Sequence, residues 1–267
     1  MERLILTLCG VLVILSGRAW PQSGEPGGVS VRLLALGDLF APDPGGPDVV
    51  PSNPAWLGLG EGVAFYGAQN PIRRNRLRLD PKGVAYRWRD VGLAWVNRLE
   101  NSSSGIRDET FLSLGRRVSS YLAVGVSVKF RRVHPSKSFQ VLGREPRGDL
   151  GLLVAPHPAV RLGFRFGAGR QGGQWIGALG GSWERGPWTA VGGVLRNAEG
   201  AWRGGGGLEY RPVPWLVLRG GLRGTVPALG LGVGVRPLRV DLTWTAVRGI
   251  GTVFLGATLT TETNAFE

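Results

Sequence analysis

The sequence predicts an all-β fold, an antiparallel transmembrane β-barrel of about 14 strands. Three observations support this prediction. Apolar residues alternate with small or polar residues along segment after segment, a secretory leader opens the chain, and the single cysteine lies inside that leader. No later run of about eighteen apolar residues follows, which argues against a helical inner-membrane protein. We therefore expect an exported protein without a disulfide framework.

Residues 1–19 have the pattern of a signal peptide. Met1 to Arg3 form a short charged start, Leu4–Leu15 is an apolar run, and a small-x-small site ends at Ala19. Such a pattern predicts cleavage after Ala19. The apolar run is too short to span a bilayer as a helix, and Cys9 lies in its middle, too early for a lipid-attachment cysteine.

The segment from Tyr121 to Arg132 shows the alternation most clearly. It is about eleven residues long, which exceeds the usual soluble strand and suits a tilted transmembrane strand. Successive side chains of a strand point to opposite faces, so each row belongs to one side of the sheet. The apolar row is Leu122, Val124, Val126, Val128 and Phe130, and the other row is Tyr121, Ala123, Gly125, Ser127, Lys129 and Arg131.

The same alternation recurs along the chain from Gly62 to Thr260. Three further segments, 175–185, 188–196 and 228–235, are rich in glycine and less regular. With Val63–Ala68 as the first strand, each strand and its turn take roughly fourteen residues, which predicts a barrel domain over residues 62–260. The other clear segments are 84–89, 91–95, 111–115, 149–154, 160–167, 202–211, 216–223, 238–245 and 253–260.

The direction of the apolar rows distinguishes two fold classes. In a soluble secreted β protein these rows form the core, whereas in a membrane barrel they face lipid. Small residues and arginine dominate the second row, as a narrow lumen requires, and aromatic residues gather near strand ends, where interfacial girdles lie. We therefore prefer the barrel. The girdle candidates are Trp88, Trp175, Trp183, Trp188, Trp202, Tyr210, Trp215 and Trp244.

Residues 20–61 differ in composition and form a separate segment. Ala41–Pro51 contains four prolines and no regular pattern. Asn53 suits a helix N-cap and Pro54 the first helical position, so a short helical turn is expected there, ending near Gly58. Residues 261–267 form a short C-terminal tail.

The chain resembles the FadL/PorV-type outer-membrane barrels, which include long-chain fatty-acid transporters and a type IX secretion accessory protein. Arg32–Phe40 is similar to that family's R-x-x-x-x-G-x-x-F stretch, and Asn53–Leu57 to its N-P-A-x-L motif. Asp149–Pro156 is similar to its D-x-G-L-L-Y-x-P hairpin, and Leu229–Val235 with Leu238–Leu242 to its C-terminal strands.

The resemblance implies an N-terminal segment (residues 20–61) folded into the lumen as a hatch. On this basis we expect a passive, hatch-gated channel for small hydrophobic or amphiphilic, acidic-headed molecules. The alternative is a PorV-like scaffold of a secretion system without transport activity. The hatch residues would be Ser52, Asn53, Pro54, Ala55, Trp56 and Leu57.

The formal net charge of +13 comes almost wholly from arginines, which are spread singly along the strands. This spacing argues against nucleic acid as a partner. Two roles stay open for the inward charges: they steer acidic head groups, or they pair with the inward acids and with hatch carbonyls. The predicted lumen-lining residues are Arg87, Arg89, Lys129, Arg131, Arg161, Arg165, Arg203, Arg219, Arg223, Arg239, Asp149, Glu209 and Asp241.

No catalytic site, metal site or cofactor is predicted. No serine lies in a nucleophile-elbow context, and His134 and His157 have no acidic or cysteine cluster at ligand spacing. We expect the outer membrane as the location. The expected partners are its lipid bilayer, the outer-membrane insertion machinery, and either a small hydrophobic ligand or secretion partners.

Overall fold

A computed structural model describes most of the barrel and most of the N-terminal segment from Ser30 onward. The predicted signal peptide and the tail after Thr261 lie outside the described residues. These residues are 30–37, 39–40, 45–69, 79–102, 105–134, 147–168, 175–196, 200–247 and 250–261.

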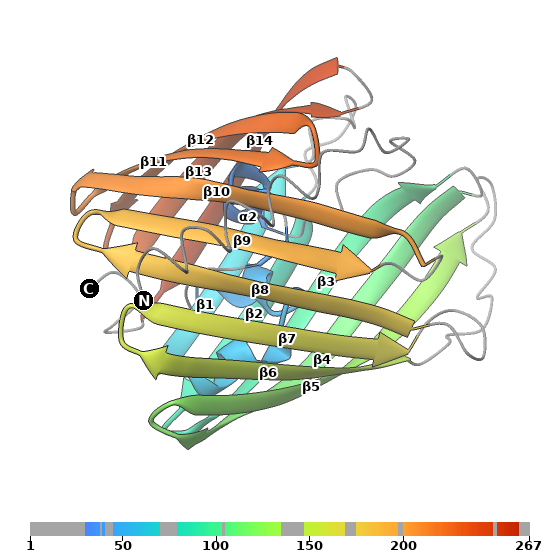
Figure 1. The fold of residues 1–267 in the computed structure, drawn as a ribbon. Helices are drawn as coiled ribbons and strands as arrows, with labels where there is room; N and C mark the ends of the chain where they lie inside the picture. Colours follow the sequence, from blue (N-terminus) through green and yellow to red (C-terminus); the bar gives the residue numbers. More distant parts are fainter. Residues whose placement is uncertain are drawn as a thin grey trace.

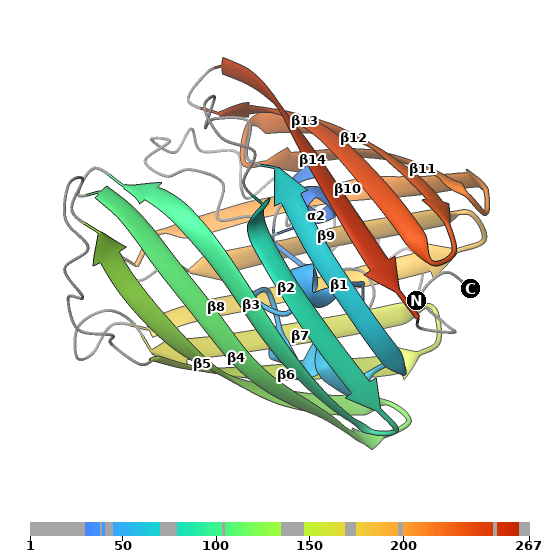
Figure 2. The ribbon, with the colours of Figure 1, turned by 180° about the vertical axis from the view of Figure 1, so that it is seen from behind.

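The described residues form fourteen antiparallel strands that close into one barrel, which confirms the predicted fold class (Figures 1 and 2). Each strand pairs with its chain neighbours, and β1 pairs with β14. The strands are β1 (Gly62–Gln69), β2 (Leu79–Trp88), β3 (Val91–Ser102), β4 (Gly105–Ser119), β5 (Leu122–His134), β6 (Arg147–His157), β7 (Val160–Ala168), β8 (Trp175–Arg185), β9 (Trp188–Arg196), β10 (Trp202–Val213), β11 (Leu216–Arg223), β12 (Val226–Val235), β13 (Leu238–Val247) and β14 (Ile250–Thr260).

The apolar rows face outward around the barrel. Leu150 is 59% exposed on the outer face, whereas Ala123 on the inner face is 1% exposed. An outer wall built of exposed leucine, valine and aromatic side chains matches a lipid-facing barrel. The alternative of a soluble protein with these rows as its core is therefore wrong.

The two ends of the barrel differ in their connections. At one end, here called the turn end, all six connections between neighbouring strands leave two residues between the strands, as between Trp88 and Val91. At the other end, the loop end, the longest connection separates His134 from Arg147. In bacterial outer-membrane barrels, short turns lie toward the periplasm and longer loops lie outside.

Three short helical elements lie inside the barrel (Figures 1 and 2). They are the α-helix α2 (Val31–Ala35) and the 3-10 helices η1 (Pro47–Val49) and η2 (Pro54–Gly58). Helix η2 begins after Asn53, as the sequence predicts. Helix α2 was not predicted, because five residues are too few for a visible helical period. No helix in the described part of the chain is long and apolar enough to cross a membrane.

Candidate functional site: the lumen and the N-terminal segment

A row of inward glycines on four neighbouring strands receives helix η2. Gly92, Gly115, Gly125 and Gly151 are in register across β3, β4, β5 and β6. A Cβ atom added at Gly92 would lie 2.2 Å from the carbonyl oxygen of Leu57. The backbone of η2 therefore lies directly on the wall, in space that any larger residue would fill.

A second inward glycine row continues around the wall. Gly163, Gly180, Gly193 and Gly205 are in register across β7, β8, β9 and β10. The ring of Phe40 lies against the first two, and a Cβ at Gly163 would be 2.0 Å from Phe40 Cε2. The glycines on the inner face thus mark the path that the N-terminal segment follows.

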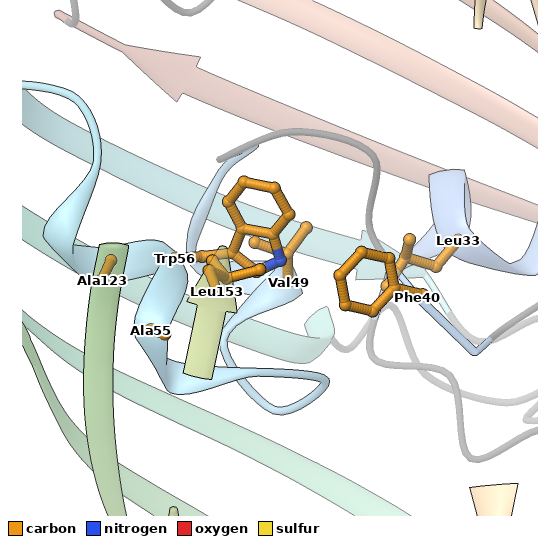
Figure 3. Packing of buried hydrophobic residues seen from close by; sticks show 7 residues of the cluster. All are labelled: Leu33, Phe40, Val49, Ala55, Trp56, Ala123 and Leu153. Carbon is orange, nitrogen blue, oxygen red and sulfur yellow. The ribbon is translucent and has the colours of Figure 1, made fainter. Parts of the chain in front are cut away.

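Apolar packing between the segment and the wall is centred on Trp56 and Phe40. Their ring centroids are 6.1 Å apart, with the planes tilted by 48°. Figure 3 shows this cluster, in which Leu33, Val49 and Ala55 of the segment join Ala123 and Leu153 of the wall. All seven side chains are buried. Burial of a large apolar side chain such as Phe40 or Leu153 contributes roughly 1.5–3 kcal/mol to the free energy of folding.

Asn53 joins η2 to the wall through polar contacts. Its side-chain oxygen accepts a hydrogen bond from the backbone N–H of Ala55 at 3.0 Å. Its amide donates to the carbonyl oxygens of Leu152 at 3.0 Å and Phe164 at 3.3 Å, on β6 and β7. One side chain thus caps the helix and fixes its position on two strands.

A buried ionic network holds the α2 end of the segment, near the turn end. Arg32 donates to both carboxylate oxygens of Glu209, at 3.1 and 3.2 Å. Arg219 donates to Glu209 and to Asp241, each at 2.7 Å, and Arg239 donates to Asp241 at 3.0 and 3.1 Å. These side chains fill the lumen beside α2 with paired charges.

Helix α2 is also held through the backbone of Val31. The N–H of Val31 donates to the hydroxyl of Tyr66 on β1 at 3.0 Å. Its carbonyl oxygen accepts a hydrogen bond from the Thr243 hydroxyl on β13 at 2.7 Å. Ser30 caps the helix by accepting from the N–H of Leu33 at 3.2 Å. The helix is thereby fixed to strands on both sides of the barrel seam.

A second group of charges lies toward the loop end. The Lys129 ammonium is 2.5 Å from Asp149, and the Arg165 guanidinium is 3.6 Å from the same carboxylate. Arg165 also donates to the carbonyl oxygen of Pro51. Near the turn end, by contrast, Arg87 on β2 donates to the carbonyl oxygen of Gly45 at 3.1 Å. Cations of the wall therefore bind both inward acids and carbonyls of the N-terminal segment.

The remaining predicted lumen residues are placed less uniformly. Arg161, Arg203 and Arg223 are half-buried on the inner side of β7, β10 and β11. The side chain of Arg131 on β5 lies outside what the structure describes. The prediction that Arg89 lines the lumen is wrong. Arg89 is exposed in the two-residue turn after β2, at φ +54°. The alternation ends with the strand at Trp88, so it assigns no face to the residue that follows.

A small polar cavity lies where the N-terminal segment meets β13 and β14. The carboxyl oxygen Oδ1 of Asp48, on η1, is buried here without a hydrogen-bond partner. Burial raises the pKa of Asp48 to about 6, and the nearby Asp241 also raises it, whereas a hydrogen bond from Ser30 and the charge of Arg32 lower it. The lining residues are Arg32, Gly45, Gly46, Asp48, Arg239, Asp241, Thr258 and Thr260.

Several residues of this site were not predicted from the sequence. Arg32 belongs to the motif that carries the family resemblance, but nothing local shows that its partner is Glu209, 177 residues away. Phe40 ends the same motif, but the motif does not show that its ring packs on Gly163 and Gly180. Asp48, Tyr66 and Thr243 carry no signal of their own. The inward glycines do carry one, because their period-two positions place them on the lumen face.

The described lumen residues offer close packing and fixed charge pairs. Among the described residues, no three His, Cys, Asp or Glu side chains gather in a way that could hold a metal ion.

No protein-family model matches this chain, and no curated protein matches its sequence. Solved structures do share its fold. The toluene transporter TodX of P. putida superposes with a TM-score of 0.64 at 12% identity, over 88% of this chain and 98% of that chain. The monoaromatic hydrocarbon channel CymD gives 0.56 at 12% identity, over 88% and 98%.

TodX and CymD are outer-membrane barrels of the FadL type. Their likeness agrees with the resemblance seen in the sequence motifs, and it gives no support to the secretion accessory barrel. At 12% identity it shows the fold alone. This chain is a closed fourteen-stranded barrel that shares its fold with these two hydrocarbon channels.

Proposed function

We propose that this protein is a passive outer-membrane channel for small hydrophobic molecules, gated by its N-terminal segment. The observation that supports the proposal is that the described part of this segment lies in the lumen while every wall strand pairs with its neighbours. The segment rests on glycine rows and ion pairs, so it can leave while all strand pairings stay intact. The gate comprises Ser52–Leu57, where η2 rests on four strands.

The cargo class is inferred from the fold neighbours and from the lumen charges. TodX is described as a toluene transporter and CymD as a monoaromatic hydrocarbon channel. In this chain Lys129, Arg165, Arg219 and Arg239 are all paired with carboxylates. An acidic head group would have to compete with those partners, so we propose that neutral hydrophobic molecules pass more readily than acidic amphiphiles.

Entry of radiolabelled toluene, octanoate and glucose into vesicles with a lipopolysaccharide outer leaflet tests this proposal. The polar sugar layer of that leaflet slows hydrophobic solutes, so a channel adds measurable entry. We expect the protein to raise toluene entry more than octanoate entry and to leave glucose excluded. A protein that raises the entry of none of the three would refute the channel.

The gate is tested in the same vesicles with Trp56→Ala and Leu57→Ala combined. Both side chains are fully buried between η2 and the wall. Their truncation should loosen η2, so that toluene entry rises and glucose begins to leak. Leu150→Ala, on the outer face of β6, is the matched control and should behave as the unaltered protein. Unchanged entry in the Trp56 and Leu57 variant would exclude Ser52–Leu57 as the gate.

A further inference from the structure

Arg196 lies on the outer face of the barrel, where defined contacts hold its side chain although it does not line the lumen. Arg196 ends β9 at the loop end, on the same face as Val194. Its guanidinium carbon lies 4.0 Å from the ring centroid of Trp175 on β8, and it donates to the Trp175 carbonyl oxygen at 3.1 Å. No described carboxylate pairs with this cation.

Aromatic side chains flank Arg196 on both neighbouring strands. Trp202 on β10 is its register partner and is exposed. The Trp175 ring lies flat over Gly177, where a Cβ would be 2.6 Å from Trp175 Cζ3. Phe166 stacks on Trp175 with ring centroids 6.0 Å apart. Tryptophan beside a cation at this level of a barrel belongs to the interface between lipid tails and head groups.

Four residues back along β9 from Arg196, beyond the outward row of Leu179 and Val194, the outer face carries glycines on three neighbouring strands. Gly181, Gly192 and Gly206 are in register across β8, β9 and β10 and face outward. At Gly192 a Cβ would meet nothing closer than 3.9 Å. Gly192 and Gly206 are nevertheless buried, because larger neighbouring side chains rise around them. At Gly181, by contrast, a Cβ would lie 3.1 Å from the Leu162 side chain. We call these three residues the glycine strip, a part of the apolar outer surface without large side chains of its own.

We propose that Arg196 and the glycine strip form a binding site for a phosphorylated glycolipid of the outer leaflet. The phosphate would lie on the Arg196 guanidinium, and an acyl chain would fill the strip. Guanidinium groups bind phosphate oxygens with paired hydrogen bonds, and a part of a lipid-facing wall without large side chains leaves room for a lipid tail. The inference rests on the proposed outer-membrane function, since only that location supplies such a lipid at the loop end.

Native mass spectrometry of the purified barrel with added lipid A tests the site. We expect one lipid to stay bound. The bound fraction should fall about tenfold in Arg196→Gln, as loss of one charge-assisted contact predicts. It should fall similarly in Gly192→Leu, which fills the strip from the outside without touching the lumen. Equal retention in Arg196→Gln and the unaltered protein would overturn the proposal.

Arg89→Gln is the matched control. Arg89 also lies over a tryptophan ring, 4.7 Å from the centroid of Trp88, but at the turn end and away from any glycine strip. Lipid retention in this variant should equal that of the unaltered protein. Phosphatidylglycerol retained as strongly as lipid A would overturn the assignment to a glycolipid. Because no cargo is present, failure of the flux experiment would leave this result unaffected.

Discussion

The N-terminal segment is held in the lumen by two regions that use different physics. Around η2, the contacts are close packing on glycines and the burial of Trp56 and Leu57. Around α2, the contacts are the charges of Arg32, Glu209 and Arg219, all nearly inaccessible to solvent. The apolar contacts around η2 contain no ionisable group, so they do not change with pH. The ionic contacts around α2 are stable only while each buried charge keeps its partner.

This difference assigns separate roles to the two regions. The packed region fixes where the segment lies, because its glycines admit only a bare backbone. In the ionic region, the attachment of the N-terminal segment depends on pH, because the neighbouring Asp48 has a pKa of about 6. The α2 and η1 region should therefore be released first when conditions change, and η2 second. Four predictions test this order, from the largest expected effect to the smallest.

Gly125→Val should remove the packed region altogether. A Cβ at this position would lie 2.4 Å from the carbonyl carbon of Pro54, so the backbone of η2 cannot stay in place. We expect a cost of about 3 kcal/mol or more and fast hydrogen exchange over residues 45–59. Gly148→Ala on β6, where the added Cβ meets nothing closer than 3.9 Å, is the control. Slow exchange in Gly125→Val would contradict the close-packing argument.

Glu209→Gln should weaken the ionic region selectively. Glu209 accepts from Arg32, Arg211 and Arg219, and these guanidinium groups would lose a buried counter-charge. Removing one member of a buried ionic network costs about 3–5 kcal/mol. Chemical unfolding in micelles should show the loss, and exchange should rise at residues 30–37 before residues 53–58. Equal rises in both regions would show that the two are not separable.

Acidity should act on the ionic region alone. The pKa of Asp48 is about 6 in the folded protein against 3.8 for the free side chain. A raised acid pKa means that the folded state holds the proton more tightly, so stability falls as pH rises from about 4 to 6 and then levels off. The full change is roughly 3 kcal/mol.

Exchange of residues 30–37 and 45–50, measured between pH 4 and 7 and corrected for intrinsic rates, checks this dependence. Asp48→Asn removes the titrating group and should flatten the profile. Asp90→Asn, an exposed acid at the turn end, should leave it as it is. If Asp48→Asn kept the pH dependence, another group would be responsible.

Asn53→Ala should give the smallest effect, because packing keeps η2 in place without it. Loss of the cap and of the contacts with Leu152 and Phe164 should cost about 1–2 kcal/mol in the unfolding experiment. Asn53→Ser keeps a cap oxygen and loses the amide donor to the two carbonyls without adding a buried charge, so it divides the cost between the two roles. A cost above that of Glu209→Gln would reverse the ranking of the two regions.

The prediction of the strands was accurate because their signal is local. The alternation at Leu122–Phe130 records which side of one strand meets lipid, and neighbouring residues suffice to show it. The same rule placed Ala123 and Asp149 on the inner face. It failed at Arg89, which follows the last strand residue and belongs to a turn.

The sequence by itself predicted a barrel, its approximate strand count and the faces of residues in the clearly alternating strands. Only the tertiary structure decided which inward glycines carry η2, that Arg32 pairs with Glu209, and that Asp48 is buried beside Asp241. Alternation is a property of successive residues along one strand. Contacts across a lumen depend instead on the closure of β1 against β14 and on the course of the N-terminal segment, and no pattern along the chain records either.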